Sequence, residues 1–114
     1  MREIRFVGMM GKFSKVAQGV MMVHARSAPV DFGFLADLAA AAGAPAELRQ
    51  RILRANTAGQ VGEWMVQGGY GQFFQRLAFA CCQAVLNYID GGVSVSADLV
   101  TTTGVYLGGA SIDA

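Results

Sequence analysis

Residues 70–90 constrain the fold most, because as a helix they would have almost no polar face. At 3.6 residues per turn their apolar side chains form two stripes, one of Phe74, Leu77, Cys81, Val85 and Tyr88, the other of Phe79, Cys82, Leu86 and Ile89. The remaining strip holds Arg76, Gln83, Asn87 and Asp90. A helix this apolar must be covered by other elements. We therefore predict that 70–90 is a central core helix or is shared between subunits.

Four shorter helices are predicted before it from the helical spacing of apolar residues, over residues 11–26, 27–42, 45–56 and 58–67. Ser27 is expected to cap the second of these, with Pro29 in its first turn and Gly43 as its stop. Thr57 and Gln60 have the spacing of a capping box, which predicts the start of the fourth.

Strand patterns are confined to the two ends of the chain. Residues 2–8 alternate loosely and end at a glycine. Residues 93–96 and 100–107 favour two short strands that turn around Ala97-Asp98. The predicted fold class is mainly α, with about five helices, a short N-terminal strand and a small C-terminal β element; α+β is the alternative. We expect one domain over 1–114, with a disordered tail at 108–114.

The composition favours self-association. Hydrophobic residues make up 54% of the chain and charged residues 15%, so few charges are left to cover a monomer's surface. A surface patch left apolar is normally an interface. We therefore expect a homo-oligomer, and a further protein partner is compatible with the same argument.

Nothing in the sequence predicts a membrane span or export. The longest apolar run, residues 77–89, is shorter than a spanning helix and contains Gln83 and Asn87. The N-terminal segment is a poor signal peptide, and the adjacent Cys81 and Cys82 do not make a disulfide framework. We expect a cytoplasmic location.

A helical hairpin at residues 35–54 carries Arg49, Arg51 and Arg54 on its second helix. DNA-reading helix-turn-helix units have this form, with a glycine turn and a basic second helix. Arg49, however, falls where an inward apolar residue is expected, and a net charge of +1 supplies little attraction for phosphate. A plain hairpin with a solvated arginine face is therefore favoured, and nucleic-acid binding is an alternative.

Cys81, Cys82 and His24 are the residues from which a thiol site could be built. The two cysteines point about 100° apart on a helix and fit packing roles better than one shared site. His24 is the chain's single histidine, and the carboxylates are scattered, so no metal site and no cofactor are predicted. A thiol-dependent or ligand-binding enzyme is the second alternative.

Residues Gly8 to Ser14 read as a strand, a glycine turn, Lys12 and a helix. Phosphate-binding loops use this order, but they need a longer glycine spacing and lysine directly before Ser or Thr, whereas Phe13 intervenes here. An ordinary strand-to-helix turn is favoured.

Taken together, these patterns favour a non-catalytic, small oligomeric interaction or assembly protein over an enzyme.

The assembly prediction can be checked by light scattering after size exclusion. We expect a mass of at least twice 12.0 kDa at micromolar concentration. A monomer at about 100 μM contradicts self-association, because mass action favours the oligomer as concentration rises.

Overall fold

The computed structural model describes residues 3–17, 30–89, 92–101 and 103–113. Along the chain the elements are β1 (Glu3–Gly8), α1 (Met10–Ala17), α2 (Phe32–Ala41), α3 (Ala46–Leu53), α4 (Ala58–Gly68), α5 (Gly71–Ile89), β2 (Ser94–Val100) and β3 (Tyr106–Ile112). The predicted fold class of five helices, an N-terminal strand and a C-terminal β element is confirmed. No helix among the described residues is long and apolar enough to cross a membrane.

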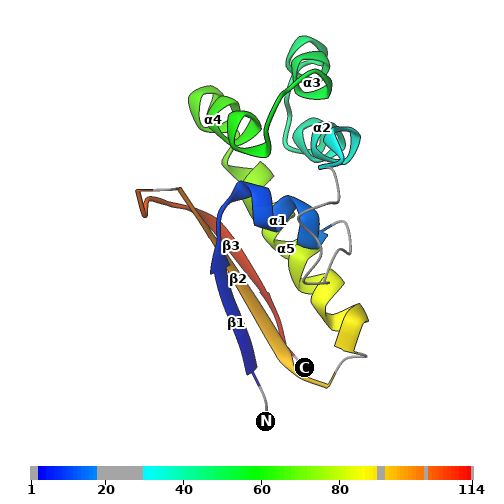
Figure 1. Cartoon of the computed structure of the whole chain (residues 1–114), viewed down its shortest axis with the longest axis vertical. Helices are drawn as coiled ribbons and strands as arrows, with labels where there is room; N and C mark the ends of the chain where they lie inside the picture. Colours follow the sequence, from blue (N-terminus) through cyan, green and yellow to red (C-terminus); the bar gives the residue numbers. More distant parts are fainter. Residues whose placement is uncertain (1–2, 18–29, 90–91, 102, 114) are drawn as a thin grey trace.

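The three strands form one sheet in the order β1-β2-β3. β1 pairs with β2 in parallel, and β2 pairs with β3 in antiparallel. Helices α1 and α5 lie on one face of the sheet, and α2, α3 and α4 gather beyond one end of it (Figure 1). All five helices therefore lie in the connection between two adjacent parallel strands.

Helix α5 is the centre of the core, as its apolar sequence predicts. Phe73, Phe74, Leu77, Ala78, Cys81 and Cys82 are all buried on it. Both predicted stripes are covered only in part, since Tyr88 of the first is 62% exposed, and Phe79 and Ile89 of the second are 44% and 38% exposed. The sheet contributes Val95, Ala97 and Leu99 to this core, and they alternate with the outward residues of β2.

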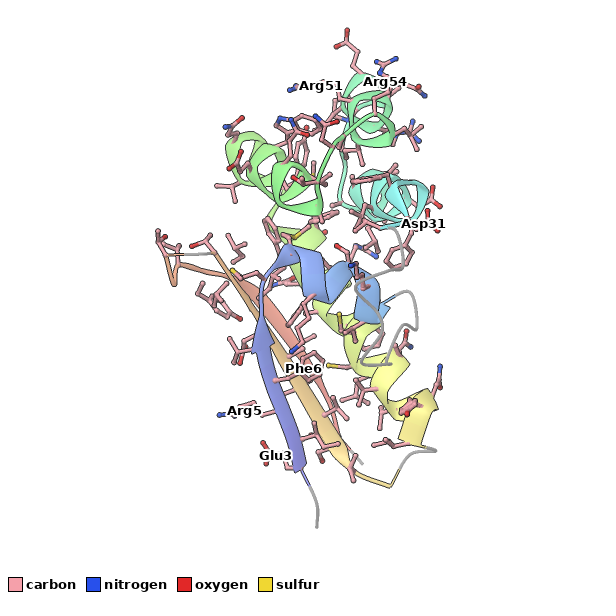
Figure 2. All side chains as sticks on the ribbon, viewed as in Figure 1. Glu3, Arg5, Phe6, Asp31, Arg51 and Arg54 are labelled. Atoms are coloured by element: carbon pink, nitrogen blue, oxygen red, sulfur yellow. The ribbon has the colours of Figure 1, made fainter. Side chains whose placement is uncertain are left out.

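The N-terminal strand places its side chains alternately on the two faces of the sheet, as a pleated strand requires. Arg5 points to the open face, and Phe6 points toward the helices (Figure 2). There the Phe6 ring lies 5.3 Å, centroid to centroid, from that of Phe13, which is fully buried on α1.

The helix starts follow local side-chain chemistry. The predicted cap of α4 is confirmed, because Thr57 Oγ1 accepts a hydrogen bond from the Gln60 amide at 3.1 Å. The Gln60 side chain reaches back to the amide of Asn56 at 3.0 Å, one residue before the cap. Helix α2 is capped by Asp31, which accepts from the Phe34 amide at 3.0 Å. The predicted start of this helix at Ser27 is therefore wrong, because residues 30 and 31 are not helical and the helix begins at Phe32. Ser27 and Pro29 themselves, and the predicted extension of α1 over residues 18–26, lie outside the described residues.

The predicted turn of the C-terminal β element at Ala97-Asp98 is wrong. Ala97 and Asp98 lie in the middle of β2, opposite Ala110 and Gly109. The turn instead follows β2, where the Thr101 hydroxyl accepts a hydrogen bond from the Val105 amide at 3.0 Å. There Gly104 supplies a positive φ of 87°. Threonine is β-branched and common in strands, so the threonines of this turn led the sequence pattern to predict a strand there.

The expected disordered tail at 108–114 is wrong for residues 108–112, which form most of β3. Ile112 pairs with Val95, and Gly108 pairs with Leu99. Ladder pairing with β2 and packing against α5 order a segment whose own sequence is a weak strand former.

Helix α5 lies close against β3 at Gly108. A Cβ built there would lie 2.9 Å from Phe74 Cβ and 3.3 Å from the Gln75 backbone nitrogen, so the helix backbone itself leaves no room for it.

We therefore expect Gly108→Ala to lower the free energy of unfolding by about 1–3 kcal/mol, because the packed helix must shift. Gly11→Ala is the matched control, since its Cβ would meet nothing within 4 Å. It should leave stability unchanged or raise it by up to about 1 kcal/mol. Urea unfolding followed by circular dichroism measures both. Equal stability of the two variants contradicts the close packing.

Candidate functional site

A groove of about 680 Å³ runs between α3 and α4. Its walls include Glu47, Arg51, Arg54, Trp64, Gln67 and Tyr70. This volume lies within the range of small-molecule sites, and a mixture of aromatic surface with a few charged groups is typical of them.

Packing of α3 decides which of its arginines reach the groove. Ile52 is fully buried and anchors the helix. All three arginines are exposed, but only Arg51 and Arg54 line the groove, and Arg49 is not part of its wall. Both groove arginines lie at the end of the molecule remote from the N-terminus (Figure 2). Of the three predicted arginines, the structure therefore brings together two.

The Arg51 guanidinium lies over the ring of Trp64, with its carbon 4.5 Å from the ring centroid. This is cation–π geometry, which holds the guanidinium plane against α4. In the part of the chain that the structure describes, neither Arg51 nor Arg54 has a carboxylate within 4.0 Å. Both arginines are exposed, so the groove presents two positive groups that a ligand can reach. Pairing of Arg51 with Trp64 depends on a tertiary contact, and sequence reasoning did not consider Trp64 as a site residue.

A second hollow, of about 330 Å³, lies on the other side of α4. Met9 and Met10 line it after the end of β1, and Val100 and Thr101 line it at the end of β2. Parallel strands commonly offer ligand sites beyond their carboxyl ends. Gln67 of α4 lines both this hollow and the α3–α4 groove.

The predicted thiol site is not assembled among the described residues. Cys81 and Cys82 are fully buried on α5 and line neither hollow, and His24 lies outside the described residues. Cys81 Sγ donates to the Phe13 carbonyl at 3.1 Å. Burial, reinforced by the neighbouring Cys82, raises the pKa of the Cys81 thiol to about 12. Burial, reinforced by the charge of Asp98, also raises the pKa of Cys82. Both thiols therefore stay protonated near neutral pH, where a nucleophile would need the thiolate.

The glycine turn between β1 and α1 is an ordinary packed turn. Gly8 ends the strand, and a Cβ there would lie 2.8 Å from the Phe13 ring. Ser14 is fully buried and donates its hydroxyl to the Met10 carbonyl at 2.7 Å, so this hydroxyl is not turned toward a ligand. Across the described ranges, no three His, Cys, Asp or Glu side chains come together to hold a metal ion.

Comparison with known proteins identifies the family. The profile of the family described as "CbiD, C-terminal domain" matches residues 22–111. The chain therefore belongs to this family of C-terminal domains. No solved structure matches it.

Several similar proteins carry one name, cobalt-precorrin-5B C(1)-methyltransferase. The one from Priestia megaterium is 54% identical over 108 residues, which is 95% of this chain and 29% of the relative. The one from Geobacillus kaustophilus is 55% identical over 107 residues, 94% of this chain and 29% of the relative. A more distant one, from Polaromonas, is 43% identical over 65% of this chain. The chain thus spans less than a third of the length of these relatives.

These comparisons correct the functional prediction. A non-catalytic interaction or assembly protein is wrong, and so is the preference against an enzyme, because the family's relatives are named methyltransferases. The two alternatives, a nucleic-acid regulator using Arg49, Arg51 and Arg54 and a small thiol-dependent or ligand-binding enzyme, are corrected with it, because neither names a methyltransferase. Nucleophiles, metal ligands and paired carboxylates are the catalytic groups that a sequence pattern can reveal, whereas moving a methyl group between two bound molecules depends chiefly on positioning.

The buried thiol generates a pH prediction. In the unfolded chain the Cys81 thiol loses its proton near its ordinary value of 9.0, whereas the folded protein keeps it to about 12. Deprotonation therefore favours the unfolded state between these values, and stability falls as pH rises above 9. Below pH 9 the Cys81 thiol is protonated in both the folded and the unfolded chain, so it adds no pH dependence to the free energy of unfolding.

Urea midpoints measured from pH 8 to 11 in the parent and in Cys81→Ala separate this effect from other titrating groups. We expect a shallower alkaline decline in the variant, together with a loss of about 1 kcal/mol at pH 7 from the missing sulfur. Parallel pH profiles would show that Cys81 is not protected in the fold.

Proposed function

We propose that this chain is the C-terminal domain of a cobalt-precorrin C(1)-methyltransferase and that its α3–α4 groove contacts the cobalt-precorrin. The observation that carries the proposal is the identity of 54–55% with methyltransferases of that name over 94–95% of this chain. Identity this high along nearly the whole chain supports the same role for the domain.

The chemistry of the groove suits such a substrate. A precorrin is a tetrapyrrole-derived ring with carboxylate side chains around its rim, so its recognition needs cations at the rim and flat apolar surface along the ring. Arg51 and Arg54 supply guanidinium forks that match carboxylate geometry. Trp64 and Tyr70 supply the aromatic surface. Glu47 also lines the groove and would repel a carboxylate, which limits how such a ring can lie there.

The work of the domain in this proposal is orientation. Methyl transfer to a ring carbon forms a carbon–carbon bond while the bond from the methyl group to its donor breaks. No protein nucleophile is needed, and the rate depends on holding the ring carbon and the methyl group in line at close distance. Fixed contacts at the ring's rim restrict its rotation, and Arg51 is itself restrained by its contact with Trp64.

Groove binding can be followed directly, because Trp64 is the only tryptophan of the chain. We expect uroporphyrin, a tetrapyrrole with eight carboxylates, to quench Trp64 fluorescence saturably. The double variant Arg51→Gln/Arg54→Gln should bind about tenfold more weakly or worse, as expected for the loss of charge-assisted contacts. Higher salt should weaken binding by the parent.

Arg49→Gln is the control for a charge on α3 that lies outside the groove, and the single variants Arg51→Gln and Arg54→Gln, each of which also removes one positive charge, are compared with it. Arg49→Gln should change the Kd by less than about twofold, because only long-range screened attraction is lost. Equal weakening by Arg49→Gln and by the groove variants, or unsaturable quenching like that of free tryptophan amide, contradicts groove binding.

Activity is tested in the context of a whole methyltransferase. This chain is exchanged for the aligned 108 residues of the Priestia megaterium relative. The exchanged gene should restore cobalamin-dependent growth to a strain lacking its own methyltransferase. Failure of a stably expressed exchange protein, where the unaltered relative succeeds, overturns the proposed function.

Homo-oligomerisation, a protein partner and a cytoplasmic location stay predictions.

A further inference from the structure

The hollow at the carboxyl ends of β1 and β2 differs in character from the α3–α4 groove. It is smaller, about 330 Å³, which is at the low end of ligand pockets and too small for a macrocycle. Its walls are mainly aliphatic side chains and thioethers, from Met9, Met10, Val66, Val100 and Leu107. A ligand here must have a compact, largely apolar part.

The charge of this pocket is opposite to that of the groove. Glu63 of α4 is the only charged residue in its wall, and within the described ranges it has no cationic side chain within 4.0 Å. Thr101 and Gln67 add neutral polar groups. The pocket therefore favours a cationic or neutral ligand over the anion that suits Arg51 and Arg54.

Two glycines shape the wall that α4 contributes. At Gly62 an added Cβ would lie 2.7 Å from Met10 Cγ, so the helix backbone packs directly on Met10. At Gly59 the only atom near an added Cβ is Thr57 Oγ1, at 3.9 Å, so bare backbone faces open space. The pocket thus stays open beside Gly59 because no side chain fills it.

We propose that this pocket holds the sulfonium end of the methyl donor, a proposal that rests on the proposed function. A sulfonium is a compact cation with apolar substituents. Its charge suits the Glu63 carboxylate, and its substituents suit the thioether and aliphatic walls of the pocket. During transfer the S–CH₃ bond breaks and its electron pair stays on sulfur, while an electron pair of the ring carbon forms the new carbon–carbon bond. The positive charge passes to the macrocycle, and the donor leaves as a neutral thioether.

Two consequences follow from this arrangement. Glu63 attracts the charged donor more strongly than the neutral thioether product, which favours release of the product after transfer. Gln67 lines both hollows, so donor and acceptor would meet beside one residue of α4, with an anionic pocket on one side and a cationic groove on the other.

Isothermal titration of the whole chain with S-adenosylmethionine, the sulfonium probe, and with S-adenosylhomocysteine, the neutral thioether, tests the proposal without an activity assay. Gly59→Leu should weaken binding of both probes about tenfold or more, because its side chain enters the pocket. Glu63→Gln should weaken the sulfonium about fivefold, as for a partly exposed ion pair, and the thioether less than about twofold.

Gly11→Leu and Glu47→Gln are the matched controls, since both positions lie outside this pocket and Gly11 has open space around it. Neither should change the Kd of either probe by more than about twofold. Circular dichroism of every variant should match the parent, because an added Cβ at Gly59 meets no close contact.

The proposal is overturned if the chain binds neither probe, if Gly59→Leu binds as the parent does, or if Glu63→Gln weakens both probes equally. Each of these results leaves the proposed function standing if uroporphyrin still quenches Trp64 and the exchange protein still supports growth. Loss of growth with donor binding retained would overturn the proposed function instead.

Discussion

The packing of α5 against the sheet is the contact on which the rest of the structure depends. Gly108 lets the helix backbone approach β3 at Phe74, where a single added methyl group would meet it. Helix α1 also packs against α5, where the Cys81 thiol donates a hydrogen bond to the Phe13 carbonyl. Because α5 packs against β3, β2 and α1, the positions of these three elements follow from this one helix, and β1 is placed by its pairing with β2.

The two candidate sites lie on either side of α4, outside the core that α5 forms. With α1 and α5 on one face of the sheet, the carboxyl ends of β1 and β2 open beneath α4 rather than into the core (Figure 1). Helix α4 then has a hollow on each side, one with Glu63 and one with Arg51 and Arg54. A single helix separating opposite charges suits a reaction that brings a cationic donor to an anionic acceptor.

The helices were predictable because their signals are local. Spacing of apolar residues placed 70–90 as the core helix, and the capping chemistry of Thr57 and Gln60 placed the start of α4. The site was less predictable. The arginine pattern marked Arg51 and Arg54 along with Arg49, but it could not tell which of them face α4, since that depends on the burial of Ile52 and on the position of Trp64.

The sequence by itself determined the elements whose stability comes from neighbouring residues: five helices, an N-terminal strand, and the role of α5 as the main core helix. Only the tertiary structure decided where β2 ends and that residues 108–112 are a strand, because ladder partners far away in the chain order them. It also decided the pairing of Arg51 with Trp64 and the pocket under α4. Contacts between distant residues leave no periodic trace in the sequence, and so these features emerge only when the helices pack.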